Sequence, residues 1–350
     1  MSQPPHANPA ACHKAVSDFY HGYVMGLILA AVTHRSVAEA EKMIFRLFRR
    51  QQLEKFLPGL EKLGLTGLPD AVACAQYHYF SNSLGGVKVE FIPENDRKAW
   101  VRYPPPRWIF HGAVICGIPG EVNRAMLRSW HSNNGVVLGN PRLGYVCTGQ
   151  TVEGDPGLEG YFMEYDHELS PGERLRFAPD ESAPPFDPAR APELPHDTWP
   201  EERMRKAMRN YTMEYIRNLY QVMPGIFGVE GSVELAGRAA RLTGLHFYHQ
   251  TAEELGIEGD SPEAFAAWLA AMGQGQGDDT AWEANSAGPL IRQTGWRLLA
   301  GQEVVVPPPL FTAWNALWEG ALGAHNRHLR LEVTQPPSGN NGPIQWRVRG

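Results

Sequence analysis

The order of structural signals repeats once along the chain, and this repetition constrains the fold more than any other feature of the sequence. In each half, segments with helical periodicity precede two strand-like segments, a tryptophan-containing helix and a hairpin. Short matches accompany this order: QYHYFSNSLGG (76–86) with LHFYHQTAEELGI (245–257), Arg142 with Arg330, and Gly154 with Gly342. We expect an ancient duplication, and two unrelated α+β halves are the alternative.

The repeat predicts an α+β fold with two similar lobes, each with helices packed on a small antiparallel sheet, related by a pseudo-twofold duplication. The predicted domains are an N-terminal lobe at 14–169, a proline-rich linker at 170–200 and a divergent C-terminal lobe at 201–350. The linker segment could also form a long wrapping arm.

Helices and strands can be placed within both lobes. The first lobe is expected to have helices at 14–33, 36–58, 70–84 and 119–130 and strands at 87–92, 99–104, 142–148 and 159–166. The second is expected to have helices at 201–223, 231–255 and 261–272, strands at WEANS and LIRQTGWRLL, a helix at PLFTAWNALWEGALGAH and a final hairpin.

Charge and cysteine content exclude several classes of function. The net charge of −6 argues against a dedicated nucleic-acid binder, because phosphate neutralisation requires a concentrated basic face. The four cysteines include no CxxC pair, which favours a reduced, cytoplasmic protein without a zinc site. The apolar run at 23–32 is shorter than the roughly 20 residues that span a bilayer, so no membrane association is expected.

The polar stretch HSNNG (131–135) is the first candidate for chemistry. His131 could serve as a general base near neutral pH, and Asn133 and Asn134 could orient a polar substrate. The alternative is a helix C-cap in which Asn134 and Gly135 adopt left-handed conformations.

Glu159 is the second candidate, on the strand that follows the acidic turn GDPG. If this strand alternates, Glu159 shares a face with Tyr161 and Met163, and a half-buried carboxylate there could shuttle protons. The turn itself has the residues that are typical of a β-hairpin turn.

Other candidates have weaker support. Arg102, beside YPPPRW, and Arg142 could bind a substrate carboxylate through two hydrogen bonds, whereas a surface arginine stacked on aromatic rings is the alternative. His78, His111 and Tyr161 could contact a substrate, although for each histidine a structural role is the more ordinary interpretation.

A metal site and a nucleophilic cysteine are disfavoured. The pairs His246/His249 and His325/His328 have a spacing that suits a transition metal, but no acidic residue completes a HExxH motif. We therefore predict no cofactor, and we expect Cys147 to be a buried core residue.

NPRLGYVCTGQTVEGDPGLEGYFMEY (140–165) resembles the C-terminal signature of the L-2-amino-thiazoline-4-carboxylic acid hydrolase-like family. That signature consists of Asn-Pro, alternating apolar residues, a Thr, and Glu-Gly-Asp before a short aromatic strand. The positions that match it are Asn140, Pro141, Thr151, Glu153, Gly154, Asp155, Tyr161 and Tyr165. The resemblance covers roughly 15–166, with a weaker copy at about 201–349, and implies a bacterial hydrolase of small-molecule metabolism.

The leading functional hypothesis is hydrolysis of a C–N bond, other than a peptide bond, in a small polar ring or amide-like metabolite. His131 or Glu159 would activate water, Asn133 and Asn134 would orient the substrate, and Arg102 or Arg142 would bind a carboxylate. The alternatives are a non-catalytic protein that binds a small ligand and a metal-dependent enzyme that uses the histidine pairs. Self-association into a homo-oligomer is left open.

Overall fold

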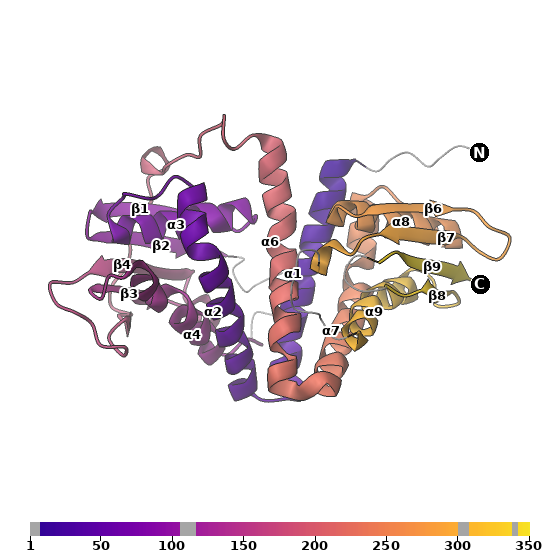
Figure 1. The fold of residues 1–350 in the computed structure, drawn as a ribbon, viewed down its shortest axis with the longest axis horizontal. Helices are drawn as coiled ribbons and strands as arrows, with labels where there is room; N and C mark the ends of the chain where they lie inside the picture. Colours follow the sequence, from indigo (N-terminus) through magenta and orange to yellow (C-terminus); the bar gives the residue numbers. More distant parts are fainter. Residues whose placement is uncertain (1–7, 106–116, 300–307, 338–341) are drawn as a thin grey trace. The chain divides into compact units, whose positions relative to one another are not determined.

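A computed structural model describes residues 8–105, 117–299, 308–337 and 342–350. The chain divides into two compact units: unit 1 consists of Met1–Ala30 with Arg205–Gly350, and unit 2 of Ala31–Met204. Each unit combines helices with its own sheet, of five strands in unit 2 and four in unit 1 (Figure 1). The predicted α+β fold with two lobes is confirmed.

Unit 2 contains one mixed sheet with helices between its strands. Its elements are α2 (Val37–Lys62), α3 (Asp70–Leu84), β1 (Glu90–Asn95), β2 (Lys98–Tyr103), α4 (Gly120–Ser129), η1 (His131–Asn133), α5 (Asn134–Leu138), β3 (Leu143–Gly149), η2 (Thr151–Glu153), β4 (Leu158–Glu164), β5 (Leu175–Phe177) and η3 (Pro188–Arg190). The strand order is β1-β2-β4-β3-β5, in which only the β3–β5 pair is parallel.

Unit 1 repeats the order of the first four strands of unit 2. Its elements are α1 (Pro9–His34, whose last turn falls in unit 2), α6 (Glu201–Val222, whose first turn falls in unit 2), α7 (Pro224–Glu254), α8 (Pro262–Gln276), β6 (Asp279–Glu283), β7 (Leu290–Thr294), η4 (Arg297–Leu299), α9 (Pro309–His325), β8 (Arg330–Gln335) and β9 (Ile344–Arg349). The strand order β6-β7-β9-β8 matches β1-β2-β4-β3, and α9 occupies the place along the chain that α4 has in unit 2. A duplication predicts this shared order.

Local signals in the sequence account for helix α2. Ser36 Oγ accepts a hydrogen bond from the Glu39 amide (3.2 Å) and donates one to the Glu39 carboxylate (2.9 Å), which is a capping box. The helix was expected to end near Pro58, but it continues to Lys62. A proline removes a single backbone hydrogen bond, and burial of Leu60 in the next turn keeps that turn helical.

Helix α1 packs in unit 1, although the sequence places it in the N-terminal lobe. Phe19 stacks on Trp318 with ring centroids 5.7 Å apart, and the Tyr23 hydroxyl lies 2.6 Å from that of Tyr220. The tryptophan-rich core of the second half therefore covers the apolar surface of α1, which explains why the unit boundary differs from the predicted domain boundary.

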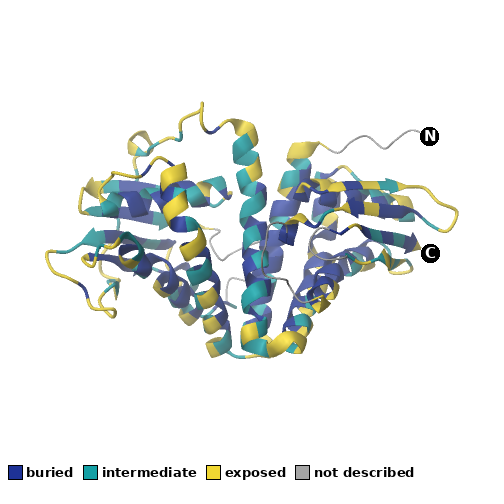
Figure 2. Cartoon of the chain, viewed as in Figure 1, coloured by how far each residue is buried: buried dark blue, intermediate teal, exposed yellow. Residues whose placement is uncertain are grey.

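Among the described helices, α1 alone is long and apolar enough to cross a membrane. In the structure, 78% of its most apolar window is buried (Figure 2). Length and composition do not separate a membrane span from a core helix, whereas burial of this extent is what a core helix shows.

The segment predicted as a linker is an arm that packs on unit 2. Strand β5 joins the edge of β3, and Ala183 and Phe186 pack against a cluster that contains Trp100 and Tyr161. Trp199, near the end of the segment, is 3% exposed. The arm therefore covers one face of the sheet and extends its edge.

Helices α7 and α9 of unit 1 approach each other closely at two glycines. A Cβ atom at Gly244 would lie 2.1 Å from the carbonyl oxygen of Leu317, and one at Gly320 would lie 2.1 Å from that of Arg241. Backbone atoms cannot rotate away as side chains can, so this contact requires glycine at both positions.

We predict that Gly244→Ala lowers the free energy of unfolding by about 2 kcal/mol or more, because the added methyl group overlaps backbone atoms of α9. Gly237→Ala on the same helix is the control, since its nearest neighbour is 3.7 Å away. This control should be neutral or stabilising by about 0.5 kcal/mol, because alanine is the better helix former. Equal urea midpoints for both variants would contradict the close contact.

Candidate functional site

Strand β4 separates His131 and Glu159, the two alternative candidates for activating water. Its side chains alternate, so Glu159 and Tyr161 point to one face of the sheet and Phe162 to the other. Tyr161 packs on Trp100, with ring centroids 4.5 Å apart. Phe162 stacks on His131, with ring centroids 5.9 Å apart and an interplanar angle of 8°. His131 and Glu159 therefore lie on opposite faces and cannot act on one substrate atom.

The inner face of the sheet carries a buried pair of imidazoles. His78 from α3 and His131 from η1 stack with ring centroids 4.1 Å apart and an interplanar angle of 11°. Their exposed fractions are 4% and 3%, and Tyr145 from β3 lies 4.6 Å from the His131 ring. The structure thus brings together two of the predicted residues, but in the core.

Asn133 and Asn134 join this pair through one buried glutamine. Gln52 of α2 accepts a hydrogen bond from Asn133 Nδ2 (2.7 Å) and donates one to Asn134 Oδ1 (2.8 Å). The side-chain amide of Asn134 in turn lies 3.4 Å from His78 Nε2. His78, Asn133 and Asn134 therefore form one hydrogen-bonded network through Gln52, which was not anticipated, and His131 joins it only by stacking on His78.

The backbone of HSNNG differs from the helix cap that was the alternative interpretation. Asn134 has φ −60° and ψ −45° and begins the short helix α5. The left-handed residue is Gly139, at the end of α5. Continuous helical backbone therefore aims Asn133 and Asn134 toward Gln52 of α2.

On the outer face, Glu159 is part of an ion-pair network that holds the arm. Its carboxylate accepts hydrogen bonds from Thr148 Oγ1 (3.0 Å) and from the backbone amide of Ala183 (2.9 Å). Arg102 lies 3.5 Å from Glu159 and 2.5 Å from Glu90. Glu159 and Arg102 therefore have the partners expected of structural residues.

Tyr161 also belongs to the outer face. Its ring lies 4.3 Å from the Lys98 ammonium group. Burial and a hydrogen bond to Glu181 raise the pKa of Tyr161 well above its usual value, so its hydroxyl is protonated at neutral pH. The structure does not bring it near His131.

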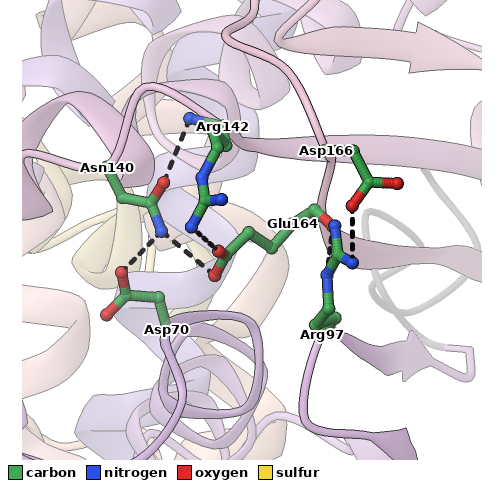
Figure 3. Close-up of polar contacts among 6 residues, drawn as sticks. All are labelled: Asp70, Arg97, Asn140, Arg142, Glu164 and Asp166. Atoms are coloured by element: carbon green, nitrogen blue, oxygen red, sulfur yellow. Dashed lines mark hydrogen bonds and ion pairs between the residues drawn. The ribbon is translucent and has the colours of Figure 1, made fainter.

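Arg142 is held in an exposed ion-pair network at the end of the β3–β4 hairpin (Figure 3). It pairs with Glu164, which also accepts a hydrogen bond from Asn140 Nδ2 (3.2 Å). Asn140 donates a second bond to Asp70 (2.8 Å), and its own Oδ1 accepts from the Arg142 amide (3.0 Å). This network ties the hairpin to α3.

His111 and Cys147 are the remaining residues considered from the sequence. His111 lies outside the described residues. Cys147 is 2% exposed, and burial raises the pKa of its thiol to about 12. A thiol with this pKa is protonated at neutral pH and is a poor nucleophile, in agreement with the predicted core position.

An open groove of about 530 Å³ lies beside η1. This arginine groove is lined by Phe45, Arg49, Arg128, Ser132, Asn133, Pro171, Gly172, Arg174, Leu175 and Phe177. Helix α2, the end of α4, η1 and the start of the arm supply these residues. Its volume is within the range typical of small-molecule sites.

The arginine groove is electropositive because its three guanidinium groups are only partly neutralised. Arg128 pairs with Glu41, and Arg49 donates to the carbonyl oxygens of Ser129 (2.8 Å) and Arg128 (3.3 Å). Burial lowers the pKa of Arg49, which remains a cation at neutral pH. Among the described residues, Arg174 has no ion-pair partner, and no carboxylate lines the groove.

Sequence reasoning missed Arg49 and Arg174 for identifiable reasons. Arg49 lies within the predicted helix 36–58, where nothing marked it as a ligand contact, and Arg174 lies in the predicted linker. Phe45 lies one helical turn before Arg49, and this spacing could have indicated that the two side chains meet. In the structure the Arg49 guanidinium lies 5.2 Å from the Phe45 ring. Nothing in the sequence places the arm opposite α2.

Metal ligation finds no support among the residues that the structure describes. No three His, Cys, Asp or Glu side chains gather there as a metal site would require. His325 instead lies 2.5 Å from the Tyr248 hydroxyl and 2.9 Å from the carbonyl oxygen of Ser261.

Comparison with family models, with curated proteins and with solved structures finds no significant match to this chain. The resemblance to the L-2-amino-thiazoline-4-carboxylic acid hydrolase-like family therefore stays a prediction.

We predict that Glu159→Gln lowers the free energy of unfolding by about 1.5 kcal/mol, because it weakens charge-assisted hydrogen bonds that hold the arm. Glu153→Gln, which breaks an exposed pair with Arg124, should cost less than about 0.5 kcal/mol. Urea denaturation measures both. If Glu159→Gln costs no more than Glu153→Gln, the structural role assigned to Glu159 is incorrect.

Proposed function

We propose that the protein binds a small, carboxylate-bearing metabolite in the arginine groove. The observation that supports this proposal is the convergence of Arg49, Arg128 and Arg174 on a groove of about 530 Å³ whose described lining contains no carboxylate. Guanidinium groups bind carboxylates through paired, charge-assisted hydrogen bonds. Arg174, which has no ion-pair partner among the described residues, is the main contributor.

The remaining lining favours a ligand that combines a ring with the acid. Phe45 and Phe177 give apolar surface, and Phe177 is 45% exposed. Ser132 and Asn133 add polar groups on the η1 side. A planar ring carrying one carboxylate would use both kinds of surface.

We propose hydrolysis of a C–N bond in such a ring as a second function. The observation that motivates it is the place of His131 in the chain, directly before the groove residues Ser132 and Asn133, although its own ring is buried and stacks on His78. In this reaction water adds to the ring carbon, the C–N bond breaks, and the nitrogen takes up a proton. His131 would be the base, without Glu159. A cytoplasmic, bacterial setting belongs to this proposal.

Binding is tested with benzoate and with benzamide, which has a similar shape but no charge. We expect benzoate to bind at least about tenfold more tightly, because only the carboxylate can pair with the arginines. Arg174→Gln should weaken benzoate binding by about tenfold. Arg142→Gln is the matched control and should leave it unchanged, because Arg142 pairs with Glu164. Calorimetric titration measures all four combinations.

Equal affinity for benzoate and benzamide, or equal effects of Arg174→Gln and Arg142→Gln, would contradict the proposed site. For the hydrolytic function, His131→Gln should abolish any ring-opening activity and retain benzoate binding. Activity that survives this substitution in a folded variant would exclude His131 as the base.

A further inference from the structure

The segment GQGQGDD (273–279) of unit 1 brings two arginines to one glycine. Gly277 ends helix α8 in a left-handed conformation, with φ +86°. A Cβ atom at this position would lie 2.6 Å from Arg209 Nη1 and 3.2 Å from Arg297 Cδ. The absence of a side chain at Gly277 therefore lets Arg209 of α6 and Arg297 of η4 converge.

The positive charge of these two arginines is poorly compensated. Arg209 is 6% exposed, and its Nε donates to Asn210 Oδ1 (3.2 Å), a neutral group. Within the described part of the chain, neither Arg209 nor Arg297 forms an ion pair. Burial, and after it the nearby Arg297, lower the pKa of Arg209, while the nearby Asp278 raises it. A buried cation without a partner is costly, and a bound anion would remove that cost.

Asp278, which lies close enough to both arginines to interact with their charge, supplies only part of the missing negative charge. Its Oδ1 accepts a hydrogen bond from the Arg297 amide (2.8 Å) and its Oδ2 accepts one from Gln293 Nε2 (3.0 Å). Burial raises its pKa to about 7, so it is only partly ionised at neutral pH. Both carboxylate oxygens of Asp278 thus accept hydrogen bonds from neutral donors, and partial protonation reduces its negative charge at neutral pH.

Unpartnered polar groups flank the same two positions. Gln276, next to Gly277, is fully buried, and neither its amide nitrogen nor its oxygen has a hydrogen-bond partner among the described residues. Trp296, next to Arg297, is 4% exposed, and its Nε1 is likewise without a partner in the described structure. Buried donors of this kind usually have a partner, often a water molecule or ligand.

We propose that Arg209 and Arg297 bind an oxyanion, the carboxylate or phosphate group of a small ligand, at Gly277 in unit 1. The two guanidinium groups supply the charge and the paired donors, and Gln276 and Trp296, their neighbours along the chain, carry donors that have no partner in the described structure. This oxyanion site is built entirely from unit 1 and is separate from the arginine groove of unit 2.

The test follows the indole ¹⁵N–¹H signal of Trp296 in the full-length chain, assigned with Trp296→Phe, during separate titrations with inorganic phosphate and with acetate. A saturable shift with a Kd below about 10 mM is expected for at least one anion, and the anion that saturates identifies the group. Arg297→Gln should weaken that binding by about tenfold or more. Arg297 is exposed, so this variant should fold normally.

Two further variants distinguish this site from the groove and from a general salt effect. Gln276→Met removes a buried, unpartnered amide and should reduce anion binding while the melting temperature stays equal or rises. Arg174→Gln in unit 2 should leave the Trp296 titration unchanged, whether or not the groove binds benzoate. No saturable shift with either anion, or a shift that persists equally in Arg297→Gln, would overturn the proposal.

Discussion

The two-residue period of strand β4 determines where chemistry can occur in unit 2. Phe162 faces inward and stacks on His131, whereas Glu159 and Tyr161 face outward beneath the arm. On the inner face the side chains contact aromatic rings and side-chain amides, and on the outer face they contact the arm and form ion pairs. Since a one-residue change of register would exchange the two faces, the sheet cannot bring His131 and Glu159 together without losing both sets of contacts. The arginine groove beside η1 is lined by Ser132 and Asn133, whereas the His131 ring is buried on the inner face.

The arginines that stabilise the fold form ion pairs with carboxylates, whereas those available to a ligand do not. Arg102 bridges two glutamates, and Arg142 is locked to Glu164 at a hairpin end. Arg174 has no such partner in the described structure, although it lies ten residues beyond Glu164, the end of the same hairpin. The same distinction marks Arg209 and Arg297 in unit 1. A guanidinium group without a carboxylate is the shared physical basis of both proposed sites.

The fold was largely predictable because its signals are local and periodic. The Ser36 capping box, the glycine pair after α3 and the alternating strands are all encoded within a few residues. The packing of α1 with unit 1 was not predictable, since it depends on tryptophans about 250 to 300 residues away. The site was predicted in part: Asn133, Asn134 and His78 do form one network, on which the His131 ring stacks. The arginine groove was missed because it forms only when the arm, which has no strong periodicity, passes α2 and η1.

The most direct test of this account is a crystal structure of the protein with benzoate bound. The account predicts that the carboxylate lies within hydrogen-bonding distance of Arg174 and Arg49, with its ring against Phe45 or Phe177. It also predicts that Glu159 keeps its contacts with Arg102 and Ala183 in that complex. Benzoate bound instead at Arg102 on the outer face of the sheet, with Glu159 displaced from the arm, would contradict it.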